Sequence, residues 1–293
     1  MGKKITIPEK HRGAYDRRVK MENRRRMNGN TAGRSALVTG ASSGMGVHYA
    51  TQLAGYGYNV ILVSNQDAQL REVAASIKAQ FNDIEVISIC KDLSGREAAQ
   101  ELFDFCNERG IEVEVLINNA GIFFFNDIID CPKERVSTIV NLHVFTVTML
   151  CRLFGEKMRE RRKGYILNMS SISAHTPFCG ISLYTATKSY IRTMSRAFRL
   201  ELKEFGVHVM TVSPGAVATD LYRLPKNLQR LGVNIGVIYR PEKLVRNALK
   251  RLFYTNKKEY IPGYINRLFK PVYASLPEWF KMWARKKTAC LKK

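Results

Sequence analysis

Apolar residues along this chain cluster in short runs, and longer stretches with helical periodicity separate one run from the next. The runs predict six strands and the stretches predict six helices, in alternation. The expected strands are residues 35–39, 59–63, 85–89, 113–117, 165–169 and 207–212, and the expected helices are residues 47–56, 67–81, 96–109, 133–161, 184–205 and 241–254. Because the strands are apolar throughout, they predict a parallel sheet with helices on both faces.

The alternation runs through most of the 293 residues without a Pro/Ser-rich linker, which favours a single doubly wound α/β domain. We expect this domain at residues 34–255, after a basic flexible arm at residues 1–33 and before a basic amphipathic extension at residues 256–293. A doubly wound fold binds its ligand at the carboxyl ends of the strands. The residues that follow each strand are therefore the first candidates for chemistry.

The formal net charge of +22 is concentrated at the two ends of the chain. Residues 1–33 hold ten Lys/Arg against three Asp/Glu, and residues 239–293 hold fifteen against three, whereas residues 34–238 hold twenty-two against nineteen. This distribution indicates that the ends contact an anionic surface while the nearly neutral middle has another task.

In the C-terminal extension, aromatic and aliphatic residues alternate with Lys/Arg, as in Leu268, Phe269, Trp279 and Trp283. This pattern fits a helix that lies on an anionic membrane surface. Three alternatives stay open: packing on the domain or on a partner, a solvated basic tail, and non-specific binding to a nucleic-acid backbone. No motif for specific nucleic-acid recognition accompanies the charges.

The six cysteines form no CxxC pair, and the five histidines show no metal-binding spacing, so neither a disulfide framework nor a metal site is predicted. No apolar run approaches the roughly 20 residues that span a bilayer, and no apolar signal core follows the basic N-terminus. We therefore expect a cytoplasmic protein that either stays free or associates peripherally with a membrane.

A glycine-rich turn, TGASSGMG from Thr39 to Gly46, joins the first expected strand to the first expected helix. Glycines let the backbone turn sharply and approach a pyrophosphate, and the helix N-terminus favours its negative charge. Glycine-rich turns also occur as plain connections, but the position between strand and helix favours dinucleotide binding.

Tyr184 and Lys188 lie four residues apart near the start of a predicted helix, so they share one helix face. A nearby ammonium group lowers the pKa of a phenol, which suits Tyr184 to proton transfer. Ser171, or its neighbour Ser170, ends the strand before this helix and can hold a substrate oxygen. On its own, a Tyr and a Lys at this spacing are more often a pair on the protein surface than an active site. The alternative for the two serines is an ordinary turn at the end of a strand.

Together with Asn118-Asn119-Ala120-Gly121 after the fourth strand and Pro214-Gly215 after the sixth, these motifs resemble the classical short-chain dehydrogenase/reductase family. The resemblance covers residues 34–255 and implies a Rossmann fold, NAD(P), and hydride transfer between the cofactor and a carbonyl or secondary alcohol. It also implies a homodimer or homotetramer.

The resemblance assigns roles to individual residues. Tyr184 would be the acid/base, Lys188 would lower its pKa and bind the nicotinamide ribose, Ser171 would orient the substrate oxygen, and Asn141 would hold a proton-relay water through its backbone. An ordinary helix position is the alternative for Asn141, and a helix N-cap is compatible with a cofactor contact for Asp92. The implied cofactor contacts are Thr39, Gly40, Ser42, Ser43, Gly44, Met45, Gly46, Asn65, Asp92, Leu93, Asn119, Ala120, Gly121, Tyr184, Lys188, Pro214, Gly215, Val217 and Thr219.

Asn65 occupies the position after the second strand where an acidic residue selects NAD and a basic residue selects NADP. A neutral side chain there does not repel a phosphate, so NADP is slightly favoured. Residues 220–239 are expected to form a substrate lid, and Phe123 to Phe125 add apolar surface near the site. With the C-terminal pattern, these features favour a lipophilic ketone, as in membrane-associated hydroxysteroid and long-chain ketone reductases of this family. A non-catalytic regulator that senses a cofactor is the rival, although it would not need Ser171, Tyr184 and Lys188 together.

Overall fold

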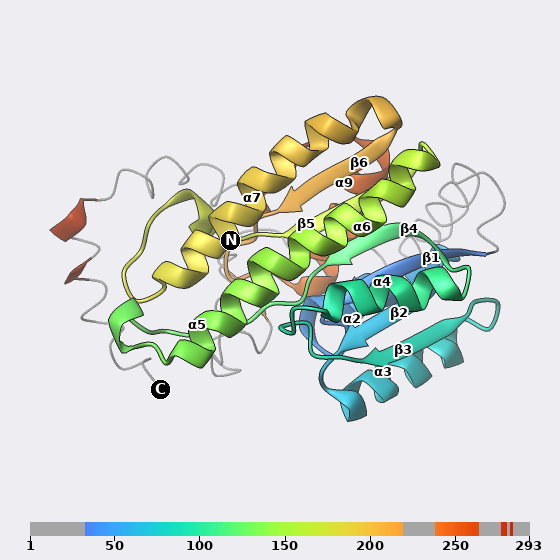
Figure 1. Cartoon of the computed structure of the whole chain (residues 1–293), viewed down its shortest axis with the longest axis horizontal. Coiled ribbons are helices and arrows are strands. Elements are labelled where there is room, and N and C mark those ends of the chain that lie inside the picture. The colour runs from blue at the N-terminus through green and yellow to red at the C-terminus, as the bar shows by residue number, and fades with distance from the viewer. Residues whose placement is uncertain (1–32, 219–237, 264–276, 280–281, 284–293) are drawn as a thin grey trace, which may run out of the picture.

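The computed structural model describes residues 33–218, 238–263, 277–279 and 282–283 (Figure 1). Its centre is a seven-stranded sheet in the order β3-β2-β1-β4-β5-β6-β7. All strand pairs are parallel, as predicted for a doubly wound fold. The strands are β1 (Arg34–Thr39), β2 (Asn59–Ser64), β3 (Val86–Cys90), β4 (Glu112–Asn118), β5 (Gly164–Met169), β6 (Val207–Val212) and β7 (Glu259–Tyr260).

Helices cover both faces of the sheet (Figure 1). The α-helices are α2 (Gly44–Gly55), α3 (Asp67–Gln80), α4 (Ala98–Glu108), α5 (Lys133–Val140), α6 (Val147–Glu160), α7 (Ser182–Leu202) and α9 (Pro241–Tyr254). The short turns are η1 (Ile128–Asp130), η2 (Asn141–Thr146), η3 (Ile172–His175) and η4 (Lys203–Phe205). Helix α9 and strand β6 have the predicted bounds, whereas α2 begins three residues earlier than predicted.

Alternate residues of the central strands face two separate cores. Ala36 and Val38 of β1 pack with residues of α2, α3 and α9 on one face, and Leu37 between them packs with α4, α6 and α7 on the other. Both faces are covered by apolar side chains, so most positions of the central strands are apolar. Strand β7, at residues 259–260, was not predicted and lies just beyond the expected end of the domain at residue 255.

The predicted long helix at residues 133–161 is divided by the π-helical turn η2 into α5 and α6. Contrary to expectation, this stretch is long and apolar enough to cross a membrane, although 44% of its apolar window is buried in the fold. Leu150, Phe154 and Met158 are buried in the core. Packing against the domain therefore accounts for this composition, and it is weak evidence for a membrane span.

Several predicted features lie outside the described residues: nearly all of the basic arm, Thr219, residues 220–237 of the expected lid, and most of the C-terminal extension. Within the described part of the chain, five cysteines are free thiols: Cys90, Cys106, Cys131, Cys151 and Cys179.

Candidate active site

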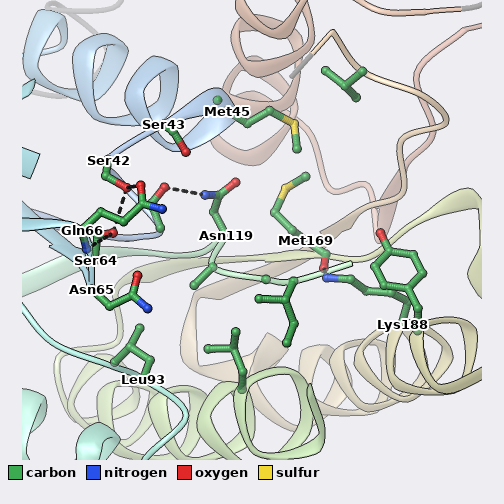
Figure 2. Close-up of a pocket in the computed structure, with 18 of the residues that line it drawn as sticks. Ser42, Ser43, Met45, Ser64, Asn65, Gln66, Leu93, Asn119, Met169 and Lys188 are labelled. Carbon is green, nitrogen blue, oxygen red and sulfur yellow. Dashed lines mark hydrogen bonds between the residues drawn. The ribbon is translucent and has the colours of Figure 1, made fainter. Parts of the chain in front are cut away.

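A cavity of about 410 Å³ opens at the carboxyl ends of β1 to β6. It extends from Ser42, Ser64 and Asn65 at one end to Met169 and Lys188 at the other (Figure 2). Most of the residues expected to contact a cofactor lie in its wall: Gly40, Ser42, Ser43, Gly44, Met45, Asn65, Asp92, Leu93, Asn119, Ala120, Gly121, Tyr184, Lys188, Pro214, Gly215 and Val217. The size suits a small-molecule or cofactor site.

Thr39 and Gly46 do not line the cavity themselves, but they support residues that do. The Thr39 hydroxyl accepts hydrogen bonds from the backbone N–H groups of Asn119 and Ala120, each at 3.0 Å. A Cβ on Gly46 would lie 2.0 Å from the backbone oxygen of Gly40, so only glycine lets α2 pack this closely on the turn. These two residues hold the glycine turn in place.

The glycine turn also depends on Asn119. Its side-chain amide donates to the backbone oxygens of Thr39 and Gly40, at 3.0 and 3.2 Å. Gly40 has a φ of +65°, and a Cβ there would lie 2.9 Å from the Cα of Ala120. The NNAG segment, which follows the neighbouring strand β4, therefore holds the turn in place. The N-terminus of α2, at Gly44, lies in the cavity wall. This arrangement fits a pyrophosphate.

Sequence reasoning missed several wall residues: Ser64, Gln66, Lys91, Ile122, Leu142 and Met169. Ser64 and Gln66 join Ser42 in a polar group, with 2.8 Å between the two serine hydroxyls and 3.2 Å from Ser42 Oγ to Gln66 Oε1 (Figure 2). Ser64 and Lys91 immediately precede Asn65 and Asp92, which were predicted to contact the cofactor. Including the neighbouring residues at each strand end in the prediction would have found both.

Asp92 does not cap a helix, because α4 begins only at Ala98. Its carboxylate instead accepts hydrogen bonds from the backbone N–H and the hydroxyl of Ser94, at 2.9 and 2.8 Å. The expected capping role is thus replaced by a local turn, which is common for Asp. The side chain remains exposed in the cavity wall.

Tyr184 and Lys188 lie on one face of α7, as their spacing predicts, and both line the cavity. Tyr184 is 5% exposed, and Lys188 Nζ lies 5.6 Å from the centre of its ring. Lys188 Nζ donates to the backbone oxygen of Met169 at 2.9 Å. Burial lowers the pKa of Lys188 to about 7. The ammonium group is therefore desolvated and close to its protonation threshold at neutral pH.

The two serines at the end of β5 have different partners. Ser170 lines the cavity, but its hydroxyl donates to the backbone oxygen of Lys188 at 2.8 Å. Ser171 is buried and caps the N-terminus of η3, where its Oγ accepts from the N–H and the hydroxyl of Ser173, at 3.2 and 3.0 Å. In both bonds Ser171 is the acceptor, so its own proton can be donated elsewhere.

Asn141 is the first residue of the π-helical turn η2, and its backbone N–H reaches the carbonyls of Ser137 and Thr138. Such turns inside α-helices are frequent at functional sites. Asn141 itself is half-buried and does not line the cavity, whereas its neighbour Leu142 does. The long helix therefore changes its geometry where the resemblance places a relay residue.

His143, two residues further on, was not predicted as a site residue. It is fully buried, accepts a hydrogen bond from the Ile122 N–H through Nε2 at 3.0 Å, and contacts the Thr187 hydroxyl through Nδ1 at 3.0 Å. Burial, and then the charge of Lys188, lower the pKa of His143 well below its ordinary value. Its imidazole is thus neutral, with the proton on Nδ1, and it supports the helix beside Tyr184, whose ring centre is 6.0 Å away.

Phe123 packs edge-on against the Tyr184 ring, with 5.0 Å between ring centres, and Phe125 packs against Phe123 at 5.4 Å. The phenylalanine run after NNAG therefore lies beside the expected acid/base, as the sequence indicated. Tyr184 is held between apolar rings and a buried ammonium group.

A family model described as short chain dehydrogenase matches residues 34–227. The very-long-chain 3-oxoacyl-CoA reductase of Homo sapiens is 30% identical over 256 residues, which cover 84% of this chain and 77% of that protein. Hydroxysteroid dehydrogenase-like protein 1 of Gallus gallus is 29% identical over 255 residues, which cover 86% of this chain and 74% of that protein.

Solved structures share the fold. A structure from a study of 7beta-hydroxysteroid dehydrogenase stereoselectivity has a TM-score of 0.77 and 24% identity, covering 86% of this chain and 96% of the other. A short-chain dehydrogenase from Sphingobium yanoikuyae in complex with NADPH has a TM-score of 0.70 and 24% identity, covering 84% and 97%. The matched segment, the parallel sheet and the cavity agree: the chain belongs to the short-chain dehydrogenase family and is an NAD(P)-dependent oxidoreductase.

Proposed function

We propose that this enzyme reduces a lipophilic ketone with NADPH and that Tyr184 donates the proton. The observation that carries the proposal is the shared cavity: the glycine turn and α2 lie at one end, and Tyr184 with Lys188 lies at the other. A dinucleotide laid along this cavity reaches both ends. A buried lysine beside a buried tyrosine at that end suits proton transfer to a substrate.

Each residue of the site has a chemical task in this proposal. NADPH, when bound, supplies the hydride that adds to the carbonyl carbon. Tyr184 gives its phenolic proton to the carbonyl oxygen, and the Lys188 ammonium group stabilises the phenolate that forms. Ser171 keeps its hydroxyl proton and uses it to donate a hydrogen bond to the same oxygen, which orients the substrate. In the oxidative direction the same residues return the proton.

We assign the return of a proton to Tyr184 to a relay that starts at the π-helical turn. Asn141 opens that turn, and a π turn leaves a backbone carbonyl outside the regular helical ladder. A water held by the Asn141 backbone would pass protons towards Lys188 and Tyr184. Asn141 would then act through its backbone, which agrees with a side chain that does not line the cavity.

A long-chain 3-oxoacyl thioester is the substrate class that we favour, with ketosteroids and ketosphingoid bases as further candidates. Phe123 and Phe125 provide apolar surface at Tyr184. Relatives at about 30% identity include a very-long-chain 3-oxoacyl-CoA reductase and a hydroxysteroid dehydrogenase-like protein. Both names describe lipophilic substrates, which fits this apolar surface.

NADPH is favoured over NADH because of the charges around the adenosine end of the cavity. Asn65 is neutral and exposed, so no carboxylate at the end of β2 repels a 2′-phosphate. Lys91, at the end of β3, also lines this part of the cavity, although it pairs with Glu101. A neighbouring structure of the same fold contains NADPH.

The test is a screen of the purified enzyme with both cofactors against a long-chain 3-oxoacyl-CoA, a ketosteroid and a ketosphingoid base. We expect oxidation of NADPH, followed by its absorbance, with at least one of the three ketones and a lower KM for NADPH than for NADH. Short water-soluble ketones serve as the control and should be poor substrates. Equal turnover of short and long ketones would contradict a lipophilic substrate.

We also propose that the C-terminal extension attaches the enzyme to an anionic membrane surface. Trp279, Met282 and Trp283 are large hydrophobic residues with 69%, 57% and 52% of their surface exposed. Met282 lies at a groove of about 670 Å³ beside the loop after η3, together with Phe178. Exposed aromatic residues among basic ones favour a lipid interface, and here they lie close to the site.

Co-sedimentation of the full chain with vesicles that contain anionic lipid tests this attachment. The double variant Trp279→Glu, Trp283→Glu is expected to lose most of the bound fraction, because both replacements remove apolar contact and add repulsion. Leu200→Glu is the matched control, since Leu200 is 70% exposed on α7. Equal loss in the control, or full binding by the double variant, would exclude this segment as the anchor.

A further inference from the structure

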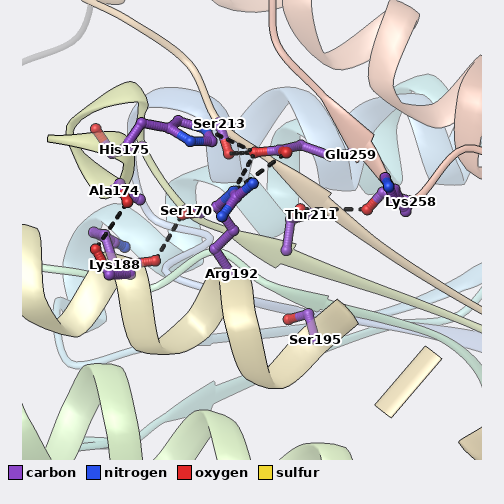
Figure 3. A network of polar contacts seen from close by, with 12 residues as sticks. Ser170, Ala174, His175, Lys188, Arg192, Ser195, Thr211, Ser213, Lys258 and Glu259 are labelled. Atoms are coloured by element: carbon purple, nitrogen blue, oxygen red, sulfur yellow. Dashed lines mark hydrogen bonds and ion pairs between the residues drawn. The ribbon is translucent and has the colours of Figure 1, made fainter. Parts of the chain in front are cut away.

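Glu259, on the short edge strand β7, connects three segments of the chain through one buried carboxylate (Figure 3). Its side chain is 9% exposed. It accepts a hydrogen bond from Ser213 Oγ at 2.7 Å, and its oxygens lie 3.1 Å from His175 Nε2 and 3.1 and 3.3 Å from Arg192 Nε. All three partners are at least partly buried, so this cluster is more than a surface ion pair.

Each partner belongs to a segment that carries part of the active site. His175 ends η3, the turn that begins after Ser171. Arg192 lies one helical turn after Lys188 on α7. Ser213 immediately precedes Pro214, which lines the cavity. The carboxylate therefore fixes the turn of Ser171, the helix of Tyr184 and the wall after β6 relative to one another.

Direct hydrogen bonds between these segments reinforce the cluster. The Ile172 N–H donates to the Pro214 carbonyl at 2.8 Å, and the Ser189 hydroxyl donates to the Ala174 carbonyl at 2.9 Å. Burial alone would raise the pKa of Glu259, but the hydrogen bonds from His175 and Ser213 and the charge of Arg192 lower it to about 2. The carboxylate is thus ionised throughout the neutral range and bonds all three partners at once.

We propose that Glu259 is a positioning residue of this enzyme, needed to align Ser171 with Tyr184 for turnover and not needed for binding of the cofactor. The proposal rests on the proposed ketone reduction. The adenosine end of the cavity, around Ser42 and Asn65, is formed by strands on the other half of the sheet. Loss of the cluster should therefore lower kcat far more than the affinity for NADPH, because small misplacements of reacting groups are costly.

A merely structural role predicts a different result, and the chain offers a matched carboxylate to separate the two. Glu114 is 3% exposed, pairs with Arg34 and Lys163 at 3.3 and 3.4 Å, and accepts from the Tyr58 hydroxyl at 3.1 Å. It lies near the start of β4, at the opposite end of the strands from the cavity. Its loss should cost stability without touching the site.

The experiment compares Glu259→Gln with Glu114→Gln in the full chain. Both variants should melt at lower temperature than wild type. We expect kcat of Glu259→Gln with a long-chain 3-oxoacyl-CoA to fall by about 10-fold to 100-fold, as for misaligned groups, whereas Glu114→Gln keeps the wild-type kcat. The NADPH dissociation constant, from quenching of its fluorescence, should stay within about 3-fold of wild type in both, a change below 1 kcal/mol.

Hydrogen exchange adds a readout that needs no turnover. Amides of residues 172–176 should exchange faster in Glu259→Gln and at the wild-type rate in Glu114→Gln. Equal kcat in the two variants, or unchanged exchange at residues 172–176, would overturn the role of Glu259. Should Glu259→Gln not fold, Ser213→Ala removes a single bond and is expected to give a smaller loss of kcat in the same direction. A wild-type enzyme inactive with every ketone of the screen would instead contradict the proposed function.

Discussion

Replacing Tyr184 by phenylalanine should remove nearly all turnover while leaving the cofactor bound. The variant keeps the ring that packs against Phe123 and loses only the hydroxyl. Without that proton donor, the carbonyl oxygen has no acid at the moment of hydride addition, and general acid–base catalysis contributes roughly 10²- to 10⁴-fold. We therefore expect kcat to fall by about 10³-fold. Steady-state kinetics with NADPH and the best ketone of the screen measures this loss.

A matched control removes a phenolic hydroxyl from the same helix. Tyr190 is 38% exposed, and its hydroxyl lies 2.9 Å from that of Thr148, away from the cavity wall. Tyr190→Phe should keep normal turnover, and fluorescence titration should give both variants the wild-type affinity for NADPH. Normal turnover by Tyr184→Phe would show that another group supplies the proton, and the assignment of Lys188 and Ser171 would then also fail.

Replacing Lys188 by methionine should stabilise the free protein and inactivate it. Burial lowers the pKa of Lys188 to about 7, below the ordinary lysine value of 10.5. At or below pH 7 the folded protein thus carries a charge that burial disfavours. Methionine removes that charge but also the bond from Nζ to the Met169 carbonyl, so we expect a net gain of about 2 kcal/mol in the free energy of unfolding. Turnover should fall about 100-fold or more, because the phenolate of Tyr184 loses its cation.

The pH dependence of thermal melting tests the reason for this gain. Between pH 7 and pH 10.5 the unfolded wild-type chain binds a proton at Lys188 that the folded protein does not, so wild-type stability should rise with pH over that interval. The advantage of Lys188→Met should accordingly be full at pH 7 and shrink towards pH 10. Lys157→Met, at an exposed lysine paired with Glu160, should change little at any pH. A lower melting temperature for Lys188→Met at pH 7 would contradict a penalty from the buried charge.

The sequence predicted the elements that have the most regular pattern. Strand β6 and helix α9 have the predicted bounds. The ends of an apolar run and of an amphipathic helical period are clear in the sequence, so both elements could be delimited from it. Strand β7 was missed, since two residues carry no period at all. The π-helical turn at Asn141 was missed as well, because the apolar periodicity continues through residues 133–161 and does not mark where the helix changes to π geometry.

Within the site, chain spacing alone placed Tyr184 and Lys188 on one face, because an α-helix brings residues four apart together. Spacing did not reveal which of Ser170 and Ser171 has a hydroxyl group that is available to donate a hydrogen bond to the substrate. That depends on the Lys188 carbonyl and on Ser173, which the fold brings to these serines. His143 gave no signal either, since its partners Ile122 and Thr187 lie on other segments.

The sequence by itself therefore determined the fold class and the positions of the chemical motifs, because these depend on local periodicity and on residues next to strand ends. The reaction type followed from the resemblance of those motifs to a known family. Only the tertiary structure decided the charge states and the alignment of the site. The depressed pKa of Lys188 and the three-way contact of Glu259 come from burial and from contacts between segments far apart in the chain. Desolvation and long-range pairing exist only once the chain has folded.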